Sequence, residues 1–109
     1  MKKSEINFKI TLDENHVPEN IEWEATDSGE DGLKECKALM MSLWDKNETN
    51  TMRIDIWTKE MMIDEMQHFF YQSIMTMSDT YERATNDKEI AKEMREFAQK
   101  MGEKIQSRN

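Results

Sequence analysis

The chain of 109 residues has one cysteine, one proline and three glycines, and it lacks long apolar runs. A single cysteine, Cys36, cannot form an internal disulfide, which suits a reducing cytoplasm. No segment holds the roughly 18 consecutive apolar residues of a membrane span, and no apolar stretch follows the two lysines near the N-terminus. We therefore expect a cytoplasmic protein that is neither exported nor membrane-spanning.

Positive charge is also scarce, because 15 Lys and Arg stand against 23 Asp and Glu and give a formal net charge of −8. No basic stripe interrupts this acidic balance, which repels phosphate backbones, so nucleic acid is not an expected partner. The sequence contains no glycine-rich phosphate loop, no cysteine pair for a metal and no hydrolase elbow. We expect no cofactor and no enzymatic activity, since no nucleophile, base and orienting group can be assembled.

Large apolar residues other than Met, Trp and Tyr are few. Ile, Leu, Val and Phe make up 18 of 109 residues, a proportion typical of disordered chains. The chain compensates with 11 Met and 3 Trp, which recur at strand and helix spacings. The pattern predicts one folded domain over residues 1–109, of modest stability and with a frayed end at 107–109.

The N-terminal segment 3–25 alternates apolar and polar residues on both sides of a polar turn that contains Pro18. This alternation predicts two strands joined in a hairpin, with their apolar residues on one face. The apolar residues concerned are Ile6, Phe8, Ile10 and Leu12 before the turn and Ile21, Trp23 and Ala25 after it. We expect Leu12 opposite Ile21, Ile10 opposite Trp23 and Phe8 opposite Ala25.

The remaining elements are predicted from turn residues and periodicity. Residues 26–32 indicate a turn that prepares a helix over 31–47, on the three- and four-residue spacing of its apolar side chains. A third strand follows over 52–57, then a helix from about 59 to 84 with Thr58 as its N-cap, and a last helix after residues 84–87. The sequence therefore predicts an α+β two-layer sandwich. Its three-stranded sheet, the hairpin plus one strand in an undetermined order, is covered on one face by three helices, in the order strand, strand, helix, strand, helix, helix.

Two sets of residues are candidates for function. Asp64 and His68 are four apart on the long predicted helix, with Glu65 adjacent, and this spacing allows a metal to be held, although a solvated polar helix face explains it as well. Partner contacts are predicted at residues outside the main apolar stripes, where the alternative is the edge of the core. These residues are Trp57, Met41, Met61 and Met75.

Four blocks of the sequence, in this order, carry a resemblance to a known family: KSEINFKITLDENHVPENIEW, GLKECKALMMSLWD, MRIDIWTKEMM and MSDTYERATND. Over about residues 1–87 the chain resembles the gliding motility protein GldC family of Bacteroidetes, most specifically in LDENHVPENIEW and IDIWTKEM. The resemblance implies a small soluble accessory protein of the gliding machinery, which is coupled to type IX secretion, with no established catalysis. It carries over no functional residues.

Two functional hypotheses follow. The first is an adaptor that binds other proteins of the gliding and type IX secretion systems, and the second is a metal or small-ligand sensor that uses Asp64, Glu65 and His68. A homodimer is compatible with either, because soft methionine-rich surface on a small domain could be covered by a second copy.

Overall fold

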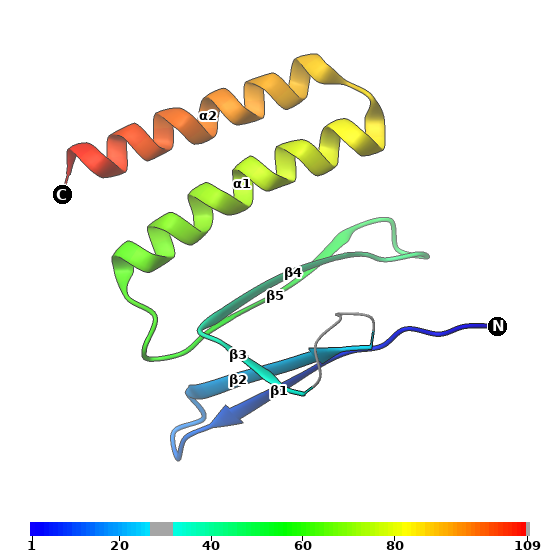
Figure 1. Cartoon of the computed structure of the whole chain (residues 1–109), viewed down its shortest axis with the longest axis vertical. Coiled ribbons are helices and arrows are strands. Elements are labelled where there is room, and N and C mark those ends of the chain that lie inside the picture. The colour runs from blue at the N-terminus through cyan, green and yellow to red at the C-terminus, as the bar shows by residue number, and fades with distance from the viewer. Residues whose placement is uncertain (27–31, 109) are drawn as a thin grey trace. The chain divides into compact units, whose positions relative to one another are not determined.

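The computed structural model describes residues 1–26 and 32–108. Its elements, in chain order, are β1 (Ile6–Leu12), β2 (Pro18–Ala25), β3 (Lys34–Cys36), β4 (Ala38–Trp44), β5 (Thr51–Trp57), α1 (Ile63–Thr85) and α2 (Lys88–Ser107) (Figure 1). The chain divides into two compact units, one over Met1–Met61 with all the strands and one that begins at Met62 and holds both helices. Residues 27–31 of the predicted turn and helix start, and residue 109 of the C-terminal end predicted to fray, lie outside the described residues.

Strands β1, β2 and β3 form one antiparallel sheet with β2 in the centre. Ile10 pairs with Ile21 and Phe8 pairs with Trp23, so the predicted pairing of β1 with β2 was wrong by two residues. A shift of two residues leaves every side chain on its own face, because strand side chains alternate with a period of two. The expected apolar face of this hairpin is therefore present, with Ile21 completely buried.

The observed pairing leaves a shorter loop between β1 and β2 than the predicted one, because Asp13 organises the turn. Its carboxylate Oδ1 accepts the backbone N–H groups of Asn15 at 2.8 Å and Val17 at 3.0 Å. The backbone N–H of Asp13 also donates to the carbonyl of Val17 at 2.9 Å, which closes the loop over five residues. The carboxylate of Asp13 is ion-paired with Lys59, and this ammonium lowers the pKa of Asp13 below its ordinary value of 3.8.

The helix predicted over 31–47 was wrong, because the described part of this segment forms β3 and β4. Its apolar residues do recur at helical spacing, but Leu39, Met41 and Leu43 also alternate as strand residues do. A short segment that is apolar in both periods cannot be assigned by periodicity, and the neighbouring strands decide its structure.

The predicted strand over 52–57 is confirmed as β5, but it pairs with β4 in a separate two-stranded antiparallel sheet. The predicted single sheet of three strands under three helices is therefore wrong. The described chain has a three-stranded and a two-stranded sheet and two helices. A tight connection over residues 45–50 joins β4 to β5, so the chain needs no helical crossover between parallel strands.

The second unit is an antiparallel pair of helices (Figure 1). Small residues lie along the line of contact, where Ser78 of α1 and Ala91 and Ala98 of α2 have no exposed surface. Small side chains allow two helices to approach closely, and the Ser78 hydroxyl donates to the carbonyl of Ile74 at 2.8 Å. Arg95 of α2 fastens the pair by donating to Asp79 at 2.9 Å and Glu82 at 3.0 Å on α1.

The helix ends differ in detail from the predicted ones. Helix α1 begins at Ile63 after Met62, whose N–H donates to the Glu65 carboxylate at 3.0 Å, so Thr58 is not its N-cap. In the turn between the helices, Asn86 ends α1 in the left-handed conformation, with φ of 59°. Asp87 then caps α2 by accepting the N–H of Ile90 at 3.1 Å. The last helix therefore begins directly after the predicted turn at 84–87.

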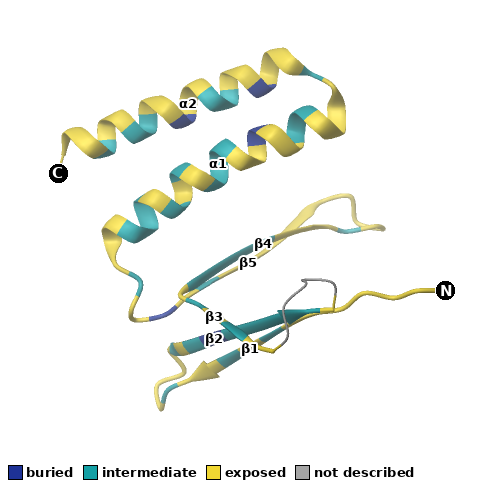
Figure 2. Ribbon diagram, in the orientation of Figure 1, coloured by how far each residue is buried: buried dark blue, intermediate teal, exposed yellow. Residues whose placement is uncertain are grey.

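Few of the described apolar side chains are completely covered. Within residues 1–26 and 32–108 the buried apolar residues are Ile21, Ala91 and Ala98, and Figure 2 shows how little of the ribbon is dark blue. Neither described helix is long and apolar enough to cross a membrane. The large apolar side chains that stay exposed are therefore candidates for contact with another molecule.

Candidate interaction surface

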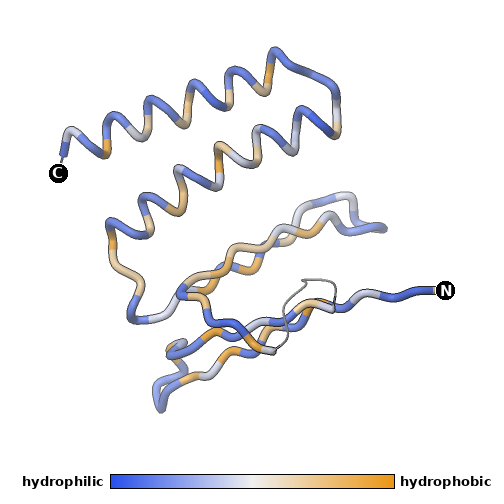
Figure 3. The backbone as a smooth tube through the Cα atoms, in the orientation of Figure 1, coloured by the Kyte–Doolittle hydropathy of each residue, from blue (hydrophilic) through white to orange (hydrophobic). Residues whose placement is uncertain are grey.

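The ribbon formed by β4 and β5 has one face made only of apolar side chains. Leu39 pairs with Ile56, Met41 with Ile54 and Leu43 with Met52, and each pair lies on the same side of the ribbon. We call these residues the apolar ribbon face: Leu39, Met41, Leu43, Met52, Ile54 and Ile56. Figure 3 shows the apolar colour along both strands. No charged residue interrupts this face.

Half of the apolar ribbon face is open to solvent, since Leu43, Ile54 and Met52 are 46–56% exposed. An isolated two-stranded hairpin is at best marginally stable in water and needs a third strand or a packed layer over its apolar side. A face of this composition resembles the centre of a protein interface, which is depleted in charge and rich in Met.

The opposite face of the ribbon is polar in its middle. Arg53 forms an ion pair with Asp55 at 2.8 Å and donates to the Ser42 hydroxyl. Trp44 and Trp57 lie on this face at opposite ends of the ribbon, and both are more than half exposed. The two faces are therefore chemically distinct, and only one offers a continuous apolar surface.

The residues predicted as partner contacts do not form one patch. Met41 belongs to the apolar ribbon face, whereas Trp57 pairs with Ala38 on the other side of the same ribbon. Met61 lies after β5 in the link to α1, and Met75 is half-buried within α1. Of the four predicted residues, only Met41 lies on the apolar ribbon face.

The sequence-based prediction missed the rest of the apolar ribbon face, because residues 31–47 were expected to be helical. A usable signal was present. Leu39, Met41 and Leu43 alternate before the turn-forming stretch 45–50, and Met52, Ile54 and Ile56 alternate after it. Two alternating runs around such a stretch are typical of a β-hairpin.

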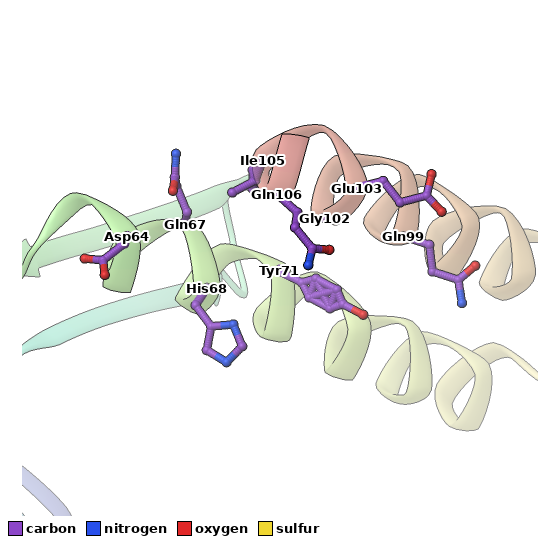
Figure 4. A pocket seen from close by; sticks show the side chains of 9 residues that line it. All are labelled: Asp64, Gln67, His68, Tyr71, Gln99, Gly102, Glu103, Ile105 and Gln106. Carbon is purple, nitrogen blue, oxygen red and sulfur yellow. The ribbon is translucent and has the colours of Figure 1, made fainter. Parts of the chain in front are cut away.

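The predicted metal ligands lie at one end of the helical pair, near an open groove between α1 and α2. The groove has a volume of about 780 Å³, and Figure 4 shows its lining. Asp64 and His68 border it from α1, and Gln99 and Glu103 border it from α2. The rings of His68 and Tyr71 are parallel within 6°, with centroids 6.4 Å apart.

The third predicted ligand, Glu65, does not line this groove, because its carboxylate accepts the N–H of Met62 at the start of α1. Nowhere in residues 1–26 or 32–108 do three or more His, Cys, Asp or Glu side chains come together as a metal site requires. The groove brings together amide, imidazole and carboxylate groups that could hydrogen-bond a small polar ligand.

Comparison with known proteins relates this chain to a family of motility proteins. Residues 18–107 match the family model described as "Gliding motility-associated protein GldC-like". The match includes β2, the whole β4–β5 ribbon and both helices. No curated protein and no solved structure gives a significant match.

Proposed function

The chain belongs to the GldC-like family of gliding motility-associated proteins, and from this membership we propose that it is a protein-binding adaptor of the gliding machinery. The predicted family is thereby confirmed. In this proposal the partners are other proteins of gliding and of type IX secretion in a bacterium of the Bacteroidetes, and the adaptor works in the cytoplasm without catalysis.

The observation that carries this proposal is the apolar ribbon face. Its uncharged side chains and high exposure favour a partner that presents an apolar surface. Burial of one large apolar side chain is worth about 1.5–3 kcal/mol, so each half-exposed residue here could contribute roughly half of that on binding. Burial of the apolar ribbon face therefore favours association with an apolar partner surface.

An adaptor role without catalysis also agrees with the state of the single thiol. Cys36 is half-buried in β3, opposite Ile21 of β2. Burial raises the pKa of the Cys36 thiol, which reduces the reactive thiolate at neutral pH. We therefore assign Cys36 to packing.

Affinity capture from a gliding bacterium tests the adaptor role, with two neighbouring variants of β5. Met52→Glu adds a negative charge to the apolar ribbon face, whereas Thr51→Glu adds the same charge on the opposite face. We expect Met52→Glu to reduce captured motility or secretion proteins at least about tenfold, because a charge buried without a partner weakens binding strongly, and Thr51→Glu to retain them.

The adaptor proposal would be abandoned on either of two results. One is that the unmodified chain enriches no motility or secretion protein while deletion of its gene leaves colony spreading and secretion unchanged. The other is that Thr51→Glu and Met52→Glu reduce capture equally although both variants keep the strand signal of the unmodified chain.

A second candidate function is a metal or small-ligand sensor, and the groove that Asp64 and His68 share favours its small-ligand version. Thermal unfolding with and without Zn²⁺, Ni²⁺, Mn²⁺ and Ca²⁺ tests the metal version, since a bound ion raises the midpoint by mass action. An increase that His68→Gln abolishes would support the sensor. An unchanged midpoint with all four ions would remove the metal version.

A further inference from the structure

The helical pair carries a second apolar surface, separate from the seam between its helices. On α1, Ile63, Phe70 and Met77 are spaced by seven residues, and on α2 the same spacing separates Ile90 from Phe97. All five side chains are 44–80% exposed. We call them the apolar helix face.

The five residues lie on one side of the helical pair. Met77 directly precedes the buried Ser78, and Ile90 and Phe97 directly precede the buried Ala91 and Ala98. One residue corresponds to a rotation of about 100° from the contact line, in the same sense on each helix. Because the two helices are antiparallel, equal rotations lead to the same side of the pair.

We propose that the apolar helix face packs against the same face of a second copy of this chain, to form a two-fold symmetric four-helix bundle. A seven-residue apolar repeat is the spacing at which helices pack side by side at shallow crossing angles. Two helical pairs joined in this way give the common arrangement of four antiparallel helices. A helical occupant thus fits the repeat.

The size of the face fits a stable dimer. Helices of 23 and 20 residues are about 35 and 30 Å long, and packed helices lie about 10 Å apart. The pair therefore presents about 30 by 20 Å, or roughly 600 Å² per copy, which approaches the roughly 800 Å² per partner of a standard interface.

Charges beside the apolar helix face are self-complementary. The helical positions of Glu93, Lys100 and Lys104 place them along its outer border on α2, whereas the border on α1 has the neutral residues Ser73 and Thr80. A two-fold axis brings the same surface of each copy together, so Glu93 of one copy can lie near Lys100 or Lys104 of the other. An acidic partner protein would attract Lys100 and Lys104 but would repel Glu93.

The proposed dimer is independent of the adaptor function, since it uses a different surface and needs no other protein. The net charge of −8 on each copy opposes association through long-range repulsion. Salt screens that repulsion while apolar contact is retained, so the dimer should strengthen as ionic strength rises.

Sedimentation equilibrium of the full chain tests the proposal, with charge substitutions two residues apart on each helix. Phe70→Glu and Phe97→Glu place a charge on the apolar helix face. Gln72→Glu and Gln99→Glu place the same charge on the other side of each helix. We expect a dimer for the unmodified chain and both Gln variants, and at least about a hundredfold weaker dimerisation for each Phe variant.

Three results would overturn the proposal. One is an unmodified chain that stays monomeric at every concentration and salt, which means that this face is covered within the chain or by another protein. Another is a dimer that Phe70→Glu and Phe97→Glu leave intact at unchanged helicity, and the third is equal disruption by the Gln controls. If a Phe variant loses helicity, Met77→Ser and Ile90→Ser probe the same face with a milder change and the same expected direction.

Discussion

The ring of Tyr71 on α1 lies against Gly102 on α2, so closely that a Cβ added at residue 102 would be 3.1 Å from the ring carbon Cε1. Glycine within a helix costs about 1 kcal/mol relative to alanine, and here the missing side chain leaves room for the aromatic ring. The same ring borders the open groove and lies parallel to His68. Tyr71 and Gly102 therefore contact each other in the wall of the groove.

Gly102→Ala should change the free energy of unfolding by less than about 0.5 kcal/mol, because the gain in helix propensity is offset by displacement of the Tyr71 ring. In a Tyr71→Ala background the ring is gone, and the same substitution should stabilise by about 1 kcal/mol. Urea unfolding of the four proteins measures this difference. Equal effects of Gly102→Ala in both backgrounds would show that the ring exerts no constraint.

Thr58→Val should stabilise the chain by about 1 kcal/mol, because it removes a buried hydroxyl without leaving a cavity. Thr58 is 3% exposed, and its Oγ1 has no hydrogen-bond partner, whereas its backbone N–H donates to the carbonyl of Lys37 at 2.8 Å. Valine keeps the shape and this backbone bond. Thermal unfolding measures the change, with Thr58→Ser, which keeps the hydroxyl, as the control that should show no gain. A destabilised Thr58→Val would contradict the assignment.

Asp13→Asn should reduce the acid sensitivity of the chain. The folded-state pKa of Asp13 is lowered, mainly by Lys59, so the ionised carboxylate contributes stability above its ordinary pKa of 3.8. This contribution is lost as the pH falls through the lower folded pKa. The free energy of unfolding of both proteins, determined at neutral pH and at pH 4 and below, measures this contribution. The variant should be less stable at neutral pH and closer to the unmodified chain in acid.

Lys59→Gln is the matched test of the same ion pair. The pKa of Lys59 is raised by Asp13, so its contribution is present below its ordinary value of 10.5 and is lost as the pH rises through the higher folded pKa. In this variant the acid-dependent contribution of Asp13 should shrink. If the dependence of stability on acidic pH were unchanged in both variants, the ion pair between Asp13 and Lys59 would not contribute to stability.

Thr49→Gly should stabilise the ribbon by about 1 kcal/mol, because Thr49 is a β-branched residue at φ of 47°, in the left-handed region that glycine adopts without strain. The surrounding turn is fixed by Asp45, whose carboxylate accepts the N–H of Asn47 at 3.0 Å. Thermal unfolding measures the gain. Glu48→Gly, at a neighbouring turn position without positive φ, serves as the control and should not stabilise.

The sequence predicted the strands whose alternation is unambiguous and the two long helices. In β1 and β2 apolar residues occupy one face only, so their common face followed from the pattern, although the turn around Asp13 moved the pairing by two residues. For α1 and α2, long stripes at helical spacing and the turn at 84–87 were sufficient.

The β4 segment could not be predicted from its own spacing alone, since Leu39, Met40, Met41, Leu43 and Trp44 satisfy both helical and strand periods, and only the alternating run after residues 45–50 indicates a hairpin. Pairing with β5 makes this segment a strand. The same pairing determines which residues form the apolar ribbon face. Met41 was predicted as a partner contact because it lay off the apolar stripe of a helix that does not form, whereas Trp57 was predicted because it lay outside the apolar set of the third strand. The two residues occupy opposite faces of the ribbon.

The exposed side chains of the ribbon make the colloidal behaviour of this chain depend on its acidity. A protein with this much exposed apolar surface stays in solution when its molecules repel one another. At neutral pH the excess of carboxylates supplies that repulsion. Acid protonates the carboxylates and reduces the repulsion between molecules, while the exposed apolar surface is unchanged. Mild acidification should therefore precipitate the protein.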